Sequence, residues 1–175
     1  MSAILEKLGV HSRATAVTNA FPSTAASRVR ATSTPALHPG AMEHYVDGAA
    51  YDRRYEGRTE DIEFYGRVAR DAETILEYGA GTGRLTLPLA RSGKKVLAVD
   101  LSSAMLRVLD ERLSLEDMSV RSRVVTQAGD MRTFSTPRRF DLVVVGFHTF
   151  CHLYSRADVV AFLARVREHL KPGGV

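Results

Sequence analysis

ILEYGAGTGRLTLPLA, residues 75–90, is the most informative stretch of the sequence. A short apolar run over Thr74–Gly79 ends in glycines, and the leucines of the following segment, Arg84–Arg91, recur at helical spacing. This pattern predicts a strand that passes through a glycine loop into a helix. Glycines at such a turn allow tight backbone geometry and let a ligand approach the main chain closely.

The same rhythm continues further along the chain. Lys95–Leu101 is a second apolar run, and Ser102 or Ser103 can then accept a bond from the free amides that open a helix. The expected buried face of this helix consists of Met105, Val108, Leu109 and Leu113. Arg123–Gln127 is the expected third strand.

Phe140–Phe147 is the expected fourth strand, and its apolar run without polar alternation is typical of a strand buried on both faces. Ser155 and Asp158 form a capping-box pattern that opens a last helix. Its expected inward face consists of Val159, Phe162, Leu163, Val166 and Leu170. Alternating strands and helices predict a doubly wound α/β fold with a mainly parallel, Rossmann-like sheet in the order 3-2-1-4.

The glycine loop does not match two common phosphate-binding patterns. A dinucleotide fingerprint needs G-x-G-x-x-G, but Gly83 comes one residue early and Arg84 stands where the third glycine is required. A P-loop needs Lys followed by Ser or Thr after its last glycine, and Arg84 with Leu85 does not supply that pair.

Three carboxylates are expected at the carboxyl edge of the sheet, where folds of this class bind ligands. Glu77 ends the first strand, Asp100 ends the second, and Asp130 follows the third. These acids would repel a pyrophosphate, whereas a cationic sulfonium that carries a ribose and an adenine would tolerate them. Taken singly, Asp100 could be a helix cap, Asp130 a turn residue, and Glu77 a partner for the loop amides.

Four motifs in order resemble those of class I S-adenosylmethionine-dependent methyltransferases. The first is ILEYGAGTGRLTLPLA, followed by VLAVDLSSAMLRVLDERL, VVTQAGDMRTF and FDLVVVGFHTFCHL. LARVREHLKPGG resembles the helix and glycine turn that precede the fifth strand of this family, and YDRRYEGRTEDIEFY resembles the lid of its small-molecule members. The resemblance implies S-adenosyl-L-methionine as cofactor.

Roles for individual residues follow from this resemblance. It implies that Gly79, Gly81 and Gly83, with Ala80 between them, line the methionine portion of the cofactor. Asp100 would hold the ribose, with Leu101 or Met105 beside the adenine. Asp130 would bond the adenine amino group together with the Met131 amide. Phe147 would lie near the sulfonium, and Tyr51 and Tyr55 would cover it.

His148 and His152 follow the fourth strand, where a catalytic base could deprotonate the acceptor; packed or solvated histidines are the alternative. Cys151 lies between them without a third well-placed ligand, so we expect a small buried thiol and no metal site. The family's asparagine, proline, proline, aromatic motif is replaced by Gly146–Thr149, which argues against nucleic-acid bases as acceptors. A small-molecule oxygen or nitrogen nucleophile is the expected methyl acceptor.

The composition gives few further indications of partners. The chain has 175 residues, 45% of them hydrophobic, and a net charge of +4. Residues 1–41 hold four basic residues against one acidic residue, so most of this charge precedes the expected domain. We therefore expect neither a nucleic-acid partner nor a membrane partner. The lone cysteine and the lack of a long apolar run indicate a cytoplasmic protein.

The expected organisation has three parts. Residues 1–41 are a disordered or leader segment, residues 42–73 an N-terminal helical lid, and residues 74–175 a partial cofactor-binding domain. The family continues beyond the point at which this chain ends, so we expect a fold that is incomplete after the fourth strand and its helix. The exposed edge of that strand would favour self-association. An inactive fragment that binds a nucleoside or a partner, and a nicotinamide dehydrogenase, are the alternative functions.

Overall fold

The computed structural model describes residues 48–55 and 57–175, and they form an α/β fold around a parallel sheet. The four strands are β1 (Thr74–Tyr78), β2 (Lys95–Asp100), β3 (Val124–Ala128) and β4 (Leu142–Val145). All neighbouring pairs are parallel and the order is β3-β2-β1-β4. This topology confirms the doubly wound sheet that the sequence predicts. The proposed leader, residues 1–41, lies outside the described residues.

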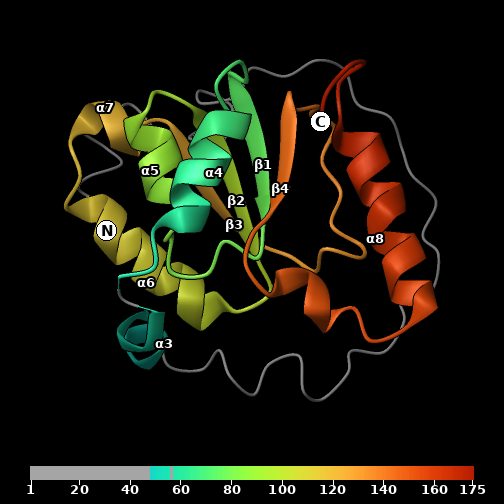
Figure 1. Cartoon of the computed structure of the whole chain (residues 1–175), viewed down its shortest axis with the longest axis horizontal. Coiled ribbons are helices and arrows are strands. Elements are labelled where there is room, and N and C mark those ends of the chain that lie inside the picture. Colours follow the sequence, from blue (N-terminus) through green and yellow to red (C-terminus); the bar gives the residue numbers. More distant parts are fainter. Residues whose placement is uncertain (1–47, 56) are drawn as a thin grey trace.

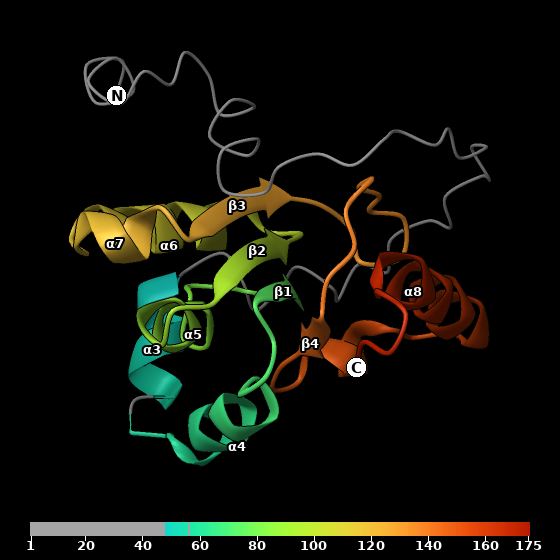
Figure 2. The same ribbon diagram turned by 90° about the horizontal axis from the view of Figure 1, so that it is seen from above.

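Helices cover both faces of the sheet (Figures 1 and 2). On one face lie α3 (Gly48–Tyr55), α4 (Glu60–Val68), α5 (Thr86–Arg91), α6 (Ser103–Ser114) and α7 (Met118–Arg121). On the other face lies α8 (Arg156–His169), preceded by the short 3₁₀ helix η2 (Thr149–His152). The sheet core is apolar, with Ile75, Leu97 and Phe140 at most 1% exposed.

The helix starts follow the capping residues in the sequence. The Ser102 hydroxyl accepts a bond from the Met105 amide at 3.3 Å, and Met105 and Leu109 are buried below it. Ser155 and Asp158 form the expected capping box at the start of α8. The inward face of α8 differs from the prediction, because Leu163 is 52% exposed whereas His169 is buried. Phe162 already occupies the position over the sheet, so the adjacent Leu163 turns to solvent.

The fourth strand is shorter than its apolar sequence predicts. The last strand residue is Val145. Phe147, two residues later, has a φ of +52°, which is incompatible with extended backbone. β4 is the outer strand of the described sheet, and the Val143 amide donates to the Val175 carbonyl at 2.8 Å. This edge is therefore less open than the sequence suggests, and self-association through it stays a prediction.

The N-terminal helices are attached to the glycine loop by polar contacts. Asp52 of α3 accepts bonds from the Thr82 hydroxyl at 2.6 Å and from Arg112 of α6 at 2.5 Å. Asp61 of α4 forms a two-point ion pair with Arg84. In the described part of the chain, no helix is long and apolar enough to cross a membrane.

Candidate active site

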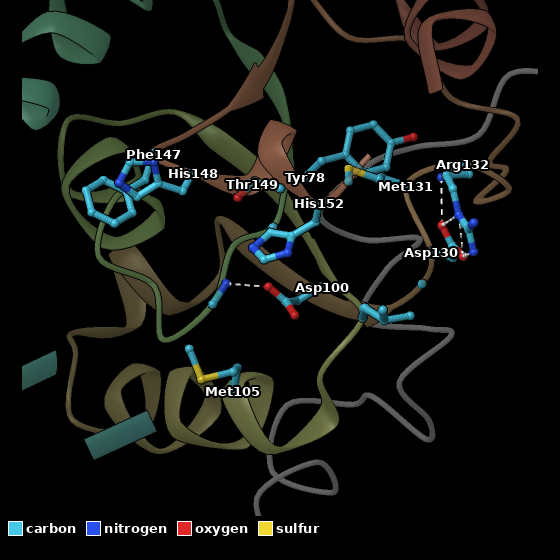
Figure 3. Close-up of a pocket in the computed structure, with 14 residues that line it drawn as sticks. Tyr78, Asp100, Met105, Asp130, Met131, Arg132, Phe147, His148, Thr149 and His152 are labelled. Atoms are coloured by element: carbon cyan, nitrogen blue, oxygen red, sulfur yellow. Dashed lines mark hydrogen bonds and ion pairs between the residues drawn. The ribbon is translucent and has the colours of Figure 1, made fainter. Parts of the chain in front are cut away.

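A pocket opens at the carboxyl ends of the parallel strands, where the sequence predicts a ligand (Figure 3). Of the predicted site residues, its lining includes Gly79, Gly81, Asp100, Leu101, Met105, Asp130, Met131, Phe147, His148 and His152. The lining also includes Tyr78, Gly129, Arg132 and Thr149, which the sequence analysis did not select. The glycine loop and the segments after β2, β3 and β4 thus meet at one edge of the sheet.

Asp100 lies at the centre of the pocket and ties its walls together. Its carboxylate accepts the Gly81 amide and the Ser102 amide, each at 2.8 Å. Burial raises the pKa of Asp100, while the bonds from these two amides oppose the rise. Each carboxylate oxygen keeps capacity for a further donor, since a carboxylate offers about four acceptor sites. Asp100 can therefore accept two ligand hydroxyls without losing its loop contacts.

The glycine loop brings its backbone to the pocket through conformations that other residues avoid. Gly79, Gly81 and Gly83 have φ of +68°, +56° and +88°. A β-carbon on Gly79 would overlap the side chain of Thr149 on η2, and one on Gly83 would overlap Leu109 of α6. The loop is thus in direct contact with the segment that follows β4 and with the helix that follows β2.

Of the predicted site residues whose side chains the structure describes, four do not line the pocket. Glu77 is buried below the loop, where its carboxylate accepts the Thr86 hydroxyl at 2.6 Å. Ala80 packs against the α5 and α6 side chains, and Gly83 faces Leu109. Tyr55 contacts Phe147 edge to face, with ring centroids 4.6 Å apart. The side chain of Tyr51 lies outside what the structure describes.

Burial makes the Glu77 carboxyl a weaker acid than an exposed glutamate. It raises the pKa of this carboxyl to about 8; the Thr86 bond opposes the rise, and the charge of Asp100 adds to it. This carboxyl therefore holds its proton to a higher pH than an exposed glutamate does, and its side chain lies below the loop rather than in the pocket. The sequence places Glu77 at the end of β1 but does not show which way its side chain points.

Phe147 and His148 form the opposite end of the pocket from Asp130 and Arg132 (Figure 3). The rings of Phe147 and His148 contact each other, with centroids 4.3 Å apart. The guanidinium of Arg84 lies 5.2 Å from the Phe147 ring centroid and that of Arg58 lies 5.5 Å from it. The positive φ of Phe147 is the kind of backbone strain that recurs at functional sites.

A second hollow of about 440 Å³ lies beyond Phe147 and His148, and these two residues line both cavities. Its other lining residues are Arg58, Glu60, Asp61, Phe64 and Tyr65. The walls therefore combine aromatic rings with charges of both signs. Two cavities that share one wall provide the arrangement needed to bring two reactants together at that wall.

The two histidines and the cysteine differ in position. His152 faces Asp100 inside the first pocket and contacts the Tyr154 hydroxyl at 3.2 Å, whereas His148 is exposed at the shared wall. The expected buried thiol is wrong, because Cys151 is exposed on η2. Within residues 48–55 and 57–175, no group of three or more His, Cys, Asp or Glu side chains could hold a metal ion.

The fold and the pocket define an α/β domain with a ligand pocket at its strand ends, a buried carboxylate at the end of β2 and no P-loop lysine in its glycine loop. The chain belongs to the methyltransferase domain family, whose model matches residues 75–174. The resemblance of the sequence motifs to class I S-adenosylmethionine-dependent methyltransferases is thereby confirmed.

The chain is similar in sequence to methyltransferases of named activity. A Streptomyces fradiae dTDP-3-amino-3,6-dideoxy-alpha-D-glucopyranose N,N-dimethyltransferase is 32% identical, over 71% of this chain and 49% of its own length. A probable ribosomal RNA small subunit methyltransferase A of Methanosarcina acetivorans is 37% identical, over 58% of this chain and 36% of its own length.

A solved structure shows the same fold. The glycopeptide N-methyltransferase MtfA, crystallised with sinefungin, is 33% identical with a TM-score of 0.63, and the match covers 81% of this chain and 57% of that one. The chain spans about half the length of the curated relatives that it matches.

Proposed function

We propose that this protein transfers a methyl group from S-adenosyl-L-methionine to a nitrogen or oxygen nucleophile of a small molecule, with an amine as the leading acceptor. The observation that carries the proposal is the buried Asp100 carboxylate, which is bonded to the glycine loop in a pocket at the strand ends. A carboxylate in this position suits two adjacent ribose hydroxyls, and the absence of a P-loop lysine from the loop disfavours a phosphate ligand.

The residues of the pocket fit such a cofactor along its whole length. Asp100 would hold the ribose, and Asp130 with the Met131 amide would hold the adenine at one end of the pocket. Gly79 and Gly81, which have no side chain in the way, would hold the methionine portion near Phe147. The cofactor supplies an electrophilic methyl group on a sulfonium; the protein supplies alignment and exclusion of water.

The second hollow is the acceptor site in this proposal, because it meets the cofactor pocket at Phe147 and His148. The bound cofactor would supply its methyl group to the acceptor nitrogen by direct displacement at the methyl carbon, with the sulfur as leaving group. The proton that the nitrogen loses would go to the His148 imidazole. His148 is better placed for this step than His152, since His152 faces Asp100 and does not line the second hollow.

The choice of acceptor rests on two observations. The Streptomyces fradiae relative is named as an amino-sugar N,N-dimethyltransferase, and MtfA is named as a glycopeptide N-methyltransferase. Gly146–Thr149 stands where methyltransferases of amide and base nitrogens carry asparagine and two prolines, so we propose no nucleic-acid acceptor, although one relative is assigned to ribosomal RNA. A cytoplasmic location and the absence of a membrane partner complete the proposal.

Calorimetric titration with S-adenosylmethionine, S-adenosylhomocysteine and NAD tests the cofactor assignment. We expect binding of the two sulfur nucleosides and not of NAD, and loss of at least 100-fold in affinity in Asp100→Ala. Asp117→Asn is the matched control, because Asp117 is an exposed acid beyond α6 without a side-chain cap bond. A folded protein that binds NAD, or that binds no sulfur nucleoside, would contradict the proposal.

Transfer of a radiolabelled methyl group tests the acceptor. The probes are dTDP-3-amino-3,6-dideoxyglucose, a short peptide with a free N-terminus, and ribosomal RNA. Methylation of RNA alone would replace the small-molecule acceptor by a nucleic acid. For whichever amine is methylated, we expect His148→Gln to lower kcat by about 10- to 100-fold, within the usual range for a lost general base, and His152→Gln to affect cofactor affinity instead.

A further inference from the structure

Arg132 is the most heavily bonded side chain at the adenine end of the pocket. It is 6% exposed, and its guanidinium lies between two carboxylates, those of Asp130 and Asp158. The distances are 2.7 Å from Arg132 Nη2 to Asp130 Oδ2 and 2.6 Å from Arg132 Nη1 to Asp158 Oδ1. Figure 3 shows the Arg132 and Asp130 pair at the end of the pocket away from Phe147.

The Asp130 carboxylate is held at three points by a single residue. Its Oδ1 accepts the Arg132 backbone amide at 2.9 Å, the Nε hydrogen is shared between both oxygens at 3.0 and 3.1 Å, and Oδ2 accepts from Nη2. These contacts use three hydrogens. A carboxylate has about four acceptor sites, so room for one further donor remains.

The contact to Asp158 fixes this wall of the pocket to another part of the fold. Asp158 is 8% exposed and belongs to the capping box of α8, where its Oδ2 accepts the Ser155 amide and hydroxyl. Arg132 thus joins the loop after β3 to the start of α8. An arginine fork held by two carboxylates has little rotational freedom, and neither does the carboxylate that it binds.

We propose that Arg132 is a positioning residue that makes the nucleoside site selective for adenine over 6-oxo purines by holding the Asp130 carboxylate in one orientation. The proposal rests on the proposed cofactor. The 6-amino group of adenine can donate to the remaining acceptor site of Asp130. A 6-oxo group in the same place would set two acceptors against each other, and a carboxylate that cannot rotate away rejects it.

The test compares the affinities for S-adenosyl-L-homocysteine and S-inosyl-L-homocysteine by calorimetry. We expect the wild type to prefer the adenine nucleoside by at least 30-fold. Arg132→Lys keeps the buried positive charge but loses the fork, so the preference is expected to fall about 10-fold. Asp158→Asn leaves the Asp130 contacts in place but weakens the second hold on the fork, so its preference is expected to fall less than that of Arg132→Lys. The exposed Asp117→Asn is the control, and its preference is expected to stay within 2-fold of wild type.

A double variant separates positioning from a general structural effect. In an Asp130→Asn background the preference is already lost, so Arg132→Lys should cause no further change in it. A further fall of similar size in that background would overturn the proposal, as would an unchanged preference in Arg132→Lys. Should Arg132→Lys not fold, as judged by thermal melting, Asp130→Asn alone decides, because a preference that survives it excludes Asp130 as the reader of the base.

The wild type also distinguishes the two proposals. If it binds both nucleosides equally well, the selectivity proposal fails while the proposed cofactor class stands. If it binds neither nucleoside, the proposed function fails at its first step.

Discussion

The two ends of the pocket are built in different ways. Around Asp100 and Arg132, charged groups are mostly buried and each has several partners, among them backbone amides and opposite charges. Around Phe147, the contacts are ring to ring and guanidinium to ring, and His148 and Phe64 are exposed. The first end consists of strand termini and the loops joined to them, whereas the second consists of α4 and the turn after β4.

This difference indicates which part of the site is fixed by the fold. A buried polar group that loses a partner carries the full cost of desolvation, so the end that contains Asp100 and Arg132 tolerates few changes. An exposed surface of rings and long side chains can change its residues at small cost, which suits the recognition of different acceptors. Substitutions at the two ends should therefore differ in size of effect.

The largest effect is expected for Gly79→Ala at the glycine loop. The added methyl group would overlap Thr149, and the φ of +68° is unfavourable for alanine. Strain and overlap together should lower the free energy of unfolding by roughly 3 kcal/mol. Binding of S-adenosylhomocysteine should fall by more than 100-fold, because the loop and η2 must separate. Urea denaturation and calorimetry measure the two effects.

Gly93→Ala separates strain from overlap. Gly93 has φ +95° but no atom within 4 Å of its β-carbon position. Its cost should be about 1 kcal/mol from the backbone alone, with unchanged nucleoside affinity. Equal costs at Gly79 and Gly93 would show that the contact with Thr149 does not constrain the loop.

An effect that depends on pH is expected for Glu77→Gln. Burial raises the pKa of Glu77 from 4.5 to about 8, so the folded protein holds this proton more tightly than the unfolded chain. The wild type keeps its full stability below pH 4.5 and loses stability relative to the glutamine variant as the pH rises towards 8. Denaturation at pH 5 and pH 8.5 measures this difference.

Glu73→Gln is the control for Glu77→Gln, since Glu73 is an exposed acid just before the same strand. The Lys95 ammonium lowers the pKa of Glu73. Glu73→Gln keeps Glu77, so this variant should retain the wild-type loss of stability above pH 5. If Glu77→Gln and wild type show the same pH dependence, Glu77 is ionised in the folded protein at neutral pH and the burial argument fails.

The Asp100 end of the pocket was largely predictable from the sequence because its geometry is local. Strand ends, glycines and the acids beside them lie at fixed offsets, so Gly81 and Asp100 could be assigned to one edge before their bond was known. The capping serines, Ser102 and Ser155, were predictable for the same reason. Arg132 was not, because its second partner, Asp158, is 26 residues away and belongs to a different helix.

The Phe147 end was less predictable. A continuous apolar run suggested that β4 would extend to Phe147, but the turn that brings Phe147 and Thr149 to the pocket requires the strand to end at Val145. Apolar character alone does not encode that turn. The contact of Tyr55 with Phe147, and the exposure of Cys151, likewise depend on how separate segments pack in three dimensions.

The smallest effect is expected for Arg84→Met at the Phe147 end. This change removes the ion pair with Asp61 and the guanidinium over Phe147, while the methionine side chain keeps much of the aliphatic contact. Both side chains of the ion pair are partly exposed, so the loss of stability should be about 1 kcal/mol. Affinity for S-adenosylhomocysteine should stay within 3-fold, because Arg84 does not line the nucleoside pocket. Acceptor KM should rise instead, since α4, which lines the second hollow, loses its contact with the glycine loop. A loss of nucleoside affinity as large as that of Asp100→Ala would mean that the two ends are energetically one unit, and that the exposed end is as constrained as the buried one.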